Sequence, residues 1–185
     1  MKKFEEKTIA TEHIFSGNII SVQVDDVELP DGNQSKRELV KHPGAVAVIA
    51  LTEDKRMIFV EQYRKPLERS LVEIPAGKIE PDEAPHITAR RELEEETGYT
   101  TKTLTHITSF YTSPGFADEI IHFYYTDDIE ELDEPIAGDE DEFVERIYLS
   151  LEEAEQFIKD KKIYDAKTMY AVQYVKMMGL GIDVK

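Results

Sequence analysis

The segment AVAVIAL, residues 45–51, restricts the possible folds of this chain most strongly. It is a nearly continuous apolar run of strand length, which is typical of a β-strand buried on both faces. The next apolar stretch, RMIFVEQYR at 56–64, follows after the polar tetrapeptide TEDK. We therefore expect these two segments to form an antiparallel hairpin inside a sheet.

Other strands are indicated by alternation of apolar and polar residues. The segment IISVQVDDVELPDGNQSKRELVKH (19–42) alternates in this way and breaks at Pro30, Asp31 and Gly32. This pattern predicts a β-hairpin. Further strand-like stretches lie at 103–111, 119–126 and 143–149.

Three helices are predicted from their terminal residues. Pro85 suits a first helical turn and Gly98 suits the position just past a helix end, which brackets a helix of roughly 85–97. Ser150 and Glu153 form a capping box ahead of LEEAEQFIKD. Asp165 can cap the helix AKTMYAVQYVKMM.

The predicted elements are many short strands and three helices, which do not alternate strictly. This favours an α+β protein in which helices pack on a mixed sheet. Residues 1–41 are expected to form a separate small β element and residues 42–185 the main domain. The boundary is placed near the sequence His42-Pro43-Gly44.

Charge and cysteine content exclude several classes of function. The chain of 185 residues has 22 Lys and Arg against 39 Asp and Glu, a net charge of −17. This charge opposes binding to nucleic acid and to anionic membranes, and it opposes an anionic substrate unless a bound cation reverses the local field. With no cysteine, thiolate metal sites and cysteine nucleophiles are excluded. No signal peptide or membrane span is recognised, so we expect a cytoplasmic protein.

An acidic cluster lies in the predicted helix 85–97. Glu92, Glu95 and Glu96 are spaced i, i+3 and i+4, so they project from one helical face, whereas Glu94 points elsewhere. Such a charge run is often only a solvated face. The alternative is a metal site, because carboxylate oxygens are the ligands preferred by Mg²⁺ and Mn²⁺.

Two further features accompany the acidic face. Ala89 and Leu93 form an apolar stripe that can hold the helix on the sheet. Upstream, the sequence IPAG (74–77) places a bend at Gly77, where the backbone can approach closely and a carbonyl could add a metal ligand.

The spacing of these residues extends into a longer pattern. Gly77 is followed by five residues, Glu83, seven residues and then RELEEETGY at 91–99. The nine specified positions reproduce in full the signature of the Nudix hydrolases, which the chain therefore resembles. The pattern is a strong signal because it fixes so many residues at set distances.

The resemblance implies an α/β/α sandwich with a mixed sheet and an enzyme that hydrolyses a nucleoside diphosphate linked to another group. It also implies two or three divalent ions. By residue match, the metal ligands would be Glu92, Glu95, Glu96 and the Ala76 carbonyl, while Arg91 would orient the carboxylates. Glu83 matches a glutamate whose role differs between members, and Gly77 and Gly98 are the structural glycines of the motif.

Features outside the motif resemble the ADP-ribose pyrophosphatases of this family. The sequence SPG (Ser113, Pro114, Gly115) lies where that subgroup carries a marker proline. The segment GDEDEFVE (138–145) matches its acidic catalytic loop, which makes Glu140 the general base and Glu142 a further carboxylate near the metal. The two roles could be exchanged, and a solvated loop is the alternative for this segment.

The substrate-binding residues implied by the resemblance are Arg37 and Glu38, which would meet adenine, and Arg64, which would contact a phosphate. An arginine fork suits phosphate geometry. The alternative for all three is charge at a strand edge. An aromatic residue to stack on adenine is not evident around Gly17.

The resulting hypothesis is a homodimeric, Mg²⁺-dependent enzyme, with Mn²⁺ as the other candidate ion, that cuts ADP-ribose into AMP and ribose 5-phosphate. The subgroup exchanges its N-terminal β element between subunits, and residues 1–41 are compatible with such a swapped dimer. The alternatives are the same chemistry on other ADP-sugars, NADH or oxidised nucleotides, a sensor of ADP-ribose that does not cut, and an acidic scaffold protein.

Overall fold

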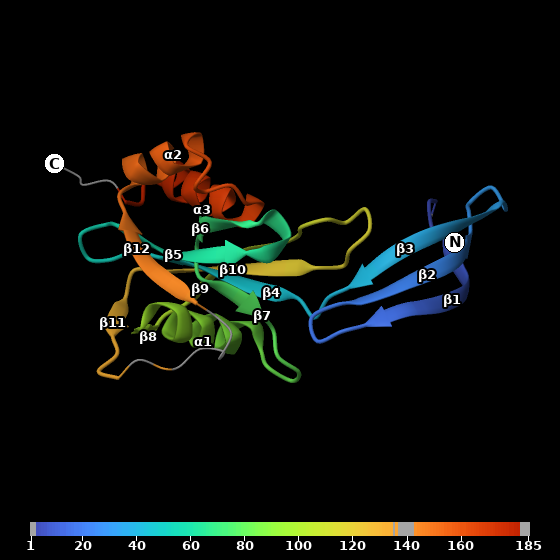
Figure 1. Ribbon diagram of the computed structural model, residues 1–185, viewed down its shortest axis with the longest axis horizontal. Coiled ribbons are helices and arrows are strands. Elements are labelled where there is room, and N and C mark those ends of the chain that lie inside the picture. Colours follow the sequence, from blue (N-terminus) through green and yellow to red (C-terminus); the bar gives the residue numbers. More distant parts are fainter. Residues whose placement is uncertain (1–2, 135, 137–142, 182–185) are drawn as a thin grey trace. The chain divides into compact units, whose positions relative to one another are not determined.

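The computed structural model describes residues 3–134, 136 and 143–181. The chain divides into two compact units, which are described separately. Unit 1 comprises Met1–Gly44 and Phe110–Ile121, and unit 2 comprises Ala45–Ser109 and His122–Lys185. Figure 1 gives the labels of the helices and strands.

Unit 1 contains a three-stranded antiparallel sheet with the order β1-β2-β3. Its strands are β1 (Lys7–Ser16), β2 (Ser21–Glu28) and β3 (Gln34–Lys41). The hairpin predicted for 19–42 is confirmed, with pairing that runs from Ser21 and Lys41 to Glu28 and Gln34. Its turn contains Gly32 at φ +86°, a conformation that glycine adopts without steric cost. Strand β1 was not predicted individually.

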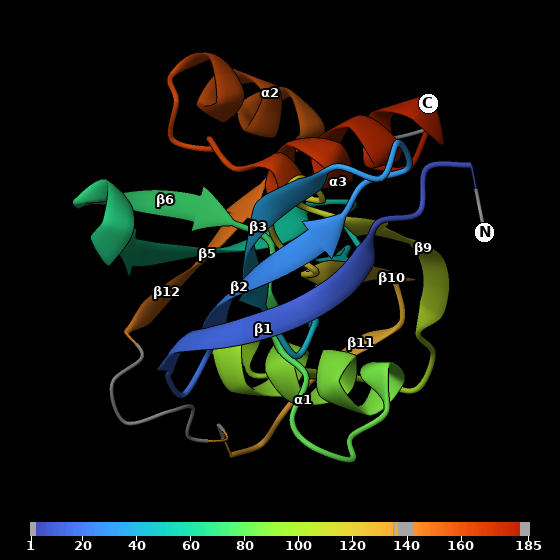
Figure 2. The ribbon, with the colours of Figure 1, turned by 90° about the vertical axis from the view of Figure 1, so that its right-hand side faces the viewer.

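In unit 2, strands are covered by helices on two sides. One sheet has the order β7-β4-β10-β9, another the order β12-β5-β6, and β11 pairs with β8. Helix α1 lies on one side of these strands and helices α2 and α3 lie on the other, as Figures 1 and 2 agree. The chain is thus a mixed α+β protein with the expected layered arrangement. The strand bounds are β4 Ala45–Ala50, β5 Met57–Arg64, β6 Arg69–Glu73, β7 Ala76–Lys78, β8 Tyr99–Thr101, β9 Thr105–Tyr111, β10 Ile120–Thr126, β11 Ile129–Glu131 and β12 Val144–Leu149.

The predicted hairpin of 45–51 with 56–64 is wrong, although both segments are strands. They meet at one isolated bridge, Leu51 with Met57, and then enter different sheets. The physical reason is that both edges of β4 are occupied, by β7 on one side and β10 on the other. Strand β5 instead pairs with β12 and β6.

The apolar run around β4 forms the centre of the core, as its sequence predicted. Val46 and Val48 of β4 are fully buried. They belong to one hydrophobic cluster with Ala89 and Leu93 of α1, which are also fully buried. The apolar stripe of α1 therefore fixes this helix against β4, and its acidic face is held in a set direction.

The helix boundaries agree closely with the sequence signals. Helix α1 spans Pro85–Thr97, α2 spans Leu151–Lys159 and α3 spans Ala166–Met177, with a short 3₁₀ helix at Lys65–Leu67. The capping box of α2 is present, since Ser150 Oγ accepts from the Glu153 backbone N–H at 3.2 Å and Glu153 Oε2 accepts from Ser150 N–H at 2.8 Å. Asp165 caps α3 by accepting from Thr168 N–H at 3.0 Å.

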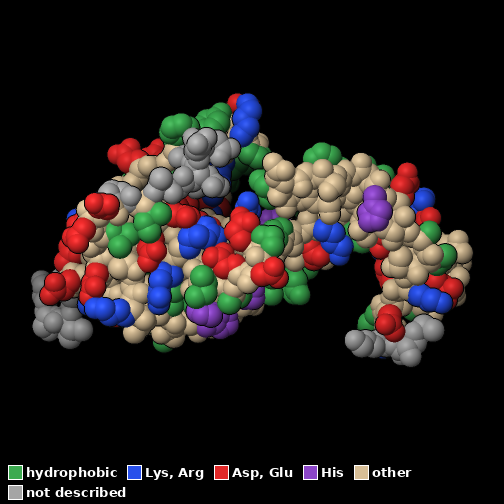
Figure 3. All heavy atoms as spheres, turned by 90° about the horizontal axis from the view of Figure 1, so that it is seen from below, with side chains coloured by type: hydrophobic (Ala, Val, Ile, Leu, Met, Phe, Trp, Pro, Cys, Tyr) green, Lys and Arg blue, Asp and Glu red, His purple; other side chains and the backbone are tan. Residues whose placement is uncertain are grey.

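The surface is highly charged. On the face in Figure 3, Asp and Glu side chains are spread over the protein with Lys and Arg side chains among them. Among the described residues, no helix is long and apolar enough to cross a membrane.

Candidate active site

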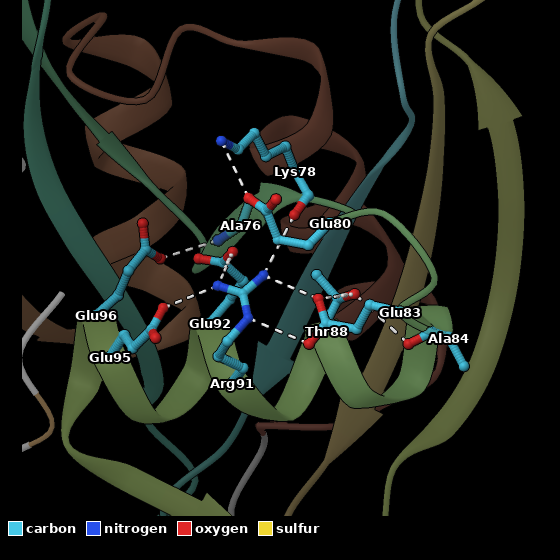
Figure 4. Close-up of polar contacts among 10 residues, drawn as sticks. All are labelled: Ala76, Lys78, Glu80, Glu83, Ala84, Thr88, Arg91, Glu92, Glu95 and Glu96. Carbon is cyan, nitrogen blue, oxygen red and sulfur yellow. Dashed lines mark hydrogen bonds and ion pairs between the residues drawn. The ribbon is translucent and has the colours of Figure 1, made fainter. Parts of the chain in front are cut away.

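Helix α1 and the short strand β7 hold the acidic cluster. The helix begins at Pro85, and Gly98 ends it at φ +70° with its N–H donating to the Glu94 carbonyl at 2.9 Å. Between these ends, Glu92, Glu95 and Glu96 project from the face of the helix near β7, as Figure 4 shows. Glu94 does not join them, because its carboxylate accepts a hydrogen bond from Thr100 Oγ1 at 2.5 Å.

Arg91 lies at the centre of this cluster (Figure 4). Its Nη1 donates to Glu92 Oε1 at 2.8 Å and to Glu95 Oε2 at 2.9 Å. Its Nε and Nη2 donate to the two oxygens of Glu83 at 3.2 and 3.1 Å, and Nη2 also reaches the Lys78 carbonyl at 3.3 Å. Burial lowers the pKa of Arg91, but the hydrogen bond with Glu83 and the charges of Glu92 and Glu95 outweigh it and hold this pKa above its usual range. Arg91 thus stays charged and orders three carboxylates.

Glu83 is itself held from a second side. Thr88 Oγ1 donates to Glu83 Oε2 at 2.8 Å, so the carboxylate lies between Thr88 and Arg91 (Figure 4). The hydrogen bond from Arg91 is the main cause that lowers the pKa of Glu83. In this structure Glu83 therefore acts on the acidic cluster through Arg91.

Gly77 leaves the space that the Glu92 carboxylate fills. A Cβ atom at this position would lie 2.0 Å from Glu92 Cδ, well inside any permitted contact. Glu92 is 7% exposed and Glu96 is 6% exposed. The backbone N–H of Ala76 donates to Glu96 Oε2 at 2.9 Å (Figure 4). The strand β7 and its glycine therefore position two of the three glutamates.

These residues fit a hard divalent cation in the type of ligand that they offer. Three carboxylates share one helical face beside the Ala76 backbone, and Gly77 gives the room that Glu92 needs. In the conformation shown, however, no group of three or more acidic, histidine or cysteine side chains among the described residues is arranged to hold an ion. The reason is visible in the contacts, since Glu92 and Glu95 face Arg91 and Glu96 faces the Ala76 amide.

A second charged group in unit 2 was not predicted. Glu73, at the end of β6, is 1% exposed and accepts from Arg64 Nε at 2.8 Å and Arg64 Nη2 at 2.7 Å. Lys167 of α3 donates to Glu73 and to Asp165. One signal for this group was present in the sequence, because Glu73 is a lone charge inside the apolar stretch SLVEIPAG. Arg64, proposed to contact phosphate, is thus fixed along one edge.

The other substrate-binding candidates belong to unit 1. Arg37 donates to both oxygens of Glu6, at 2.8 and 2.6 Å. Glu38 is its neighbour on β3 and so lies on the opposite face of that sheet. Ser113, Pro114 and Gly115 form a turn whose following residue, Phe116, accepts a backbone hydrogen bond from Val40 at the end of β3. Glu140 and Glu142 lie outside the described residues, so their roles stay predictions.

The sequence matches the models of known protein families. Residues 41–171 match the family model of the NUDIX domain, and the chain belongs to this family. Residues 6–40 match a second model, described as the nucleoside diphosphate sugar hydrolase N-terminal domain. Nudix hydrolases generally act with divalent metal ions.

Two curated relatives are similar over nearly the whole chain. An ADP-ribose pyrophosphatase of Bacillus subtilis is 59% identical over 177 residues, which is 96% of each chain. A methanol dehydrogenase activator of Bacillus methanolicus is 60% identical over 176 residues, which is 95% of each chain. Among solved structures, an ADP compounds hydrolase superposes with a TM-score of 0.80 at 20% identity, covering 95% of this chain and 96% of that one. This last likeness supports the fold alone.

Proposed function

We propose that this Nudix hydrolase cleaves the diphosphate of ADP-ribose, with Mg²⁺, to give AMP and ribose 5-phosphate. The observation that carries the proposal is the ADP-ribose pyrophosphatase that is 59% identical over 96% of both chains. It is supported by the complete sequence motif and by the way Arg91 and Gly77 hold the glutamates of that motif.

In this proposal Glu92, Glu95 and Glu96, with the Ala76 carbonyl, hold two or three divalent ions. Bound Mg²⁺ supplies positive charge to the diphosphate and lowers the pKa of the attacking water. The protein's own contribution is to fix the carboxylates, which Arg91 and the β7 backbone do. Because the protein carries a charge of −17, an anionic substrate also needs local positive charge in order to approach.

Glu140 is the proposed general base and Glu142 the alternative, on the basis of the acidic loop match. The Glu140→Gln variant should lose turnover number more than substrate affinity if Glu140 removes the proton. If only KM changes, Glu140 is not the general base, and Glu142 becomes the next candidate for that role. Arg64 is proposed to contact a phosphate, and Arg37, Glu38 and the segment 113–115 are proposed to contact the rest of the substrate.

The substrate proposal is tested by measuring AMP release from ADP-ribose beside a panel of ADP-sugars, GDP-mannose and NADH. We expect fast release with Mg²⁺, abolition by a chelator, and the highest kcat/KM on ADP-ribose. A higher kcat/KM on another diphosphate would keep the reaction class and discard ADP-ribose as the preferred substrate. Absence of cleavage across the panel would contradict the hydrolase proposal.

A second candidate function is activation of a dehydrogenase. It is favoured by the relative that is 60% identical and is a methanol dehydrogenase activator. Adding the wild type to a methanol dehydrogenase should then raise the rate of methanol oxidation. Activation could either require the hydrolytic site or be independent of it, and a Glu96→Gln variant distinguishes the two. Loss of activation in this variant would mean that activation uses the hydrolytic site.

A further inference from the structure

The buried carboxylate of Glu73 is the starting observation. It lies between Val72 and Ile74 at the end of β6 and is 1% exposed. A buried carboxylate is costly unless charged partners surround it. Burial raises the pKa of Glu73, but hydrogen bonds and charges from Arg64 and Lys167 outweigh this effect and bring the pKa to about 2. Glu73 is therefore ionised wherever the protein is folded at neutral pH.

The contact with Glu73 uses one defined edge of Arg64. The Nε and Nη2 atoms donate to the two carboxylate oxygens at 2.8 and 2.7 Å, which fixes the plane of the guanidinium. The other edge, formed by Nη1 and Nη2, still carries hydrogen-bond donors suited to a phosphate. The Arg64 side chain is 37% exposed whereas that of Glu73 is 2% exposed, so Glu73 holds it from the buried side.

Acidic groups around Arg64 favour its charged form. The hydrogen bond with Glu73 is the main cause that raises the pKa of Arg64; burial opposes it, and the charges of Glu73, Glu96 and Asp165 add to it.

Helix α3 connects to the same group through its first turn. Lys167 donates to Glu73 Oε2 and reaches Asp165 Oδ1 at 3.1 Å. The neighbouring Thr168 Oγ1 accepts from the Ile74 backbone N–H at 3.1 Å, in a fully buried contact. The start of α3 thus fixes Glu73 and Ile74, which lie just before Ala76 and Gly77 in the chain.

We propose that Glu73 and Lys167 are positioning residues for diphosphate binding. Glu73 fixes Arg64 by its Nε–Nη2 edge so that the Nη1–Nη2 edge meets a phosphate oxygen, and Lys167 keeps Glu73 in place. This inference rests on the proposed function and on the assignment of Arg64 to phosphate. The alternative is that the Glu73 ion pair only supports the fold. In that case, the effect of removing Glu73 on substrate affinity would not depend on whether Arg64 is present.

A double-mutant cycle separates these two roles. The variants are Glu73→Gln, Arg64→Ala and the combination, and the readouts are kcat/KM for ADP-ribose and Kd for its α,β-methylene analogue by calorimetry. We expect Glu73→Gln to weaken binding about tenfold in the wild-type background and less than about twofold when Arg64 is already absent. Equal losses in both backgrounds would overturn the inference.

A matched variant controls for folding. Glu73→Gln alone leaves Arg64 and Lys167 without the Glu73 carboxylate, whereas Glu73→Gln with Lys167→Met removes one charge of each sign. We expect the pair to recover melting temperature but not affinity, because Arg64 still lacks its anchor. Recovery of both would show that Glu73 supports only the fold.

The wild type distinguishes failure of this inference from failure of the proposed function. If the wild-type protein binds the analogue but releases no AMP, the proposed hydrolysis of ADP-ribose is contradicted. The double-mutant cycle then tests the role of Glu73 through the Kd values alone. Wild-type protein that does not bind the analogue contradicts both.

Discussion

The Arg91 guanidinium contacts the carboxylates of Glu83, Glu92 and Glu95 and one backbone carbonyl. Without it, neighbouring negative charges on α1 would repel one another. The function of each glutamate therefore depends on a residue that need not touch the substrate. The motif proposed to bind metal is in this respect also a local folding unit.

Neutralising one glutamate of the cluster should remove most of the activity. Glu92→Gln or Glu96→Gln should lower turnover by about a hundredfold or more, because a charged metal ligand is lost while side-chain shape is kept. Glu94→Gln is the matched control, since Glu94 bonds to Thr100 and should leave kcat nearly unchanged. Steady-state kinetics with circular dichroism checks this prediction. Near-normal kcat in both variants would refute the ligand assignment.

A methyl group at position 77 should disturb the site directly. Gly77→Ala places a Cβ 2.0 Å from Glu92 Cδ, so either the carboxylate or β7 must move. We expect a loss of about 1–3 kcal/mol in the free energy of unfolding, typical of overpacking, together with a fall in kcat. Gly115→Ala is the stability control, because among the described residues, its two chain neighbours aside, no atom lies within 4 Å of its added Cβ. A wild-type melting temperature for Gly77→Ala would contradict the packing account.

At the scale of elements, the sequence was most informative where local chemistry decides structure. The proline and glycine at the ends of α1 and the capping box of α2 specify these helices, and the structure places them as predicted. Strand partners could not be assigned in the same way. The apolar run of β4 shows that it is buried, but not that β7 and β10 occupy both its edges.

The same limit applies to the charged residues. The spacing of Glu92, Glu95 and Glu96 predicts a shared face because helical geometry is regular. Nothing in the spacing relates Glu73 to Lys167, which are 94 residues apart and meet only through the packing of α3. Their contact could be found only in the folded chain.

The charged group that joins β6, β5 and α3 should make the free energy of unfolding depend on pH in the acid range. The folded pKa of Glu73 is lowered from 4.5 to about 2, because Arg64 and Lys167 outweigh the opposing effect of burial. A lowered folded pKa means that this stabilisation is present above pH 4.5 and is lost as pH falls toward 2. Its size is about 3 kcal/mol by linkage.

Urea unfolding across this pH range measures the effect. The free energy of unfolding should fall more steeply between about pH 5 and pH 2.5 for the wild type than for Glu73→Gln with Lys167→Met. Parallel curves for the two proteins would show that Glu73 does not carry the expected linkage.

At the scale of the whole molecule, strand β1 offers a surface for the predicted homodimer. It is an edge strand of ten residues, exposed along its length, with Ile9, Ile14 and Phe15 each at least 50% exposed. Long exposed edges with apolar side chains favour pairing with another chain. The proposed homodimer would cover this strand.

Sedimentation velocity tests that assembly. We expect a dimer at micromolar concentration, and we expect Ile14→Lys with Phe15→Lys to shift the protein toward monomer because charge is placed on the covered strand. The Phe143→Lys variant, at another exposed aromatic residue, is the control. A monomeric wild type would contradict the dimer.

We propose that Glu92, Glu95 and Glu96 form the metal site of this Nudix hydrolase. Titration of Mn²⁺ followed by electron paramagnetic resonance, with the α,β-methylene analogue of ADP-ribose present, tests it most directly. We expect the wild type and Glu94→Gln to bind Mn²⁺ with the same affinity, and Glu96→Gln to bind it at least about tenfold more weakly. Equal affinity in all three proteins would contradict it.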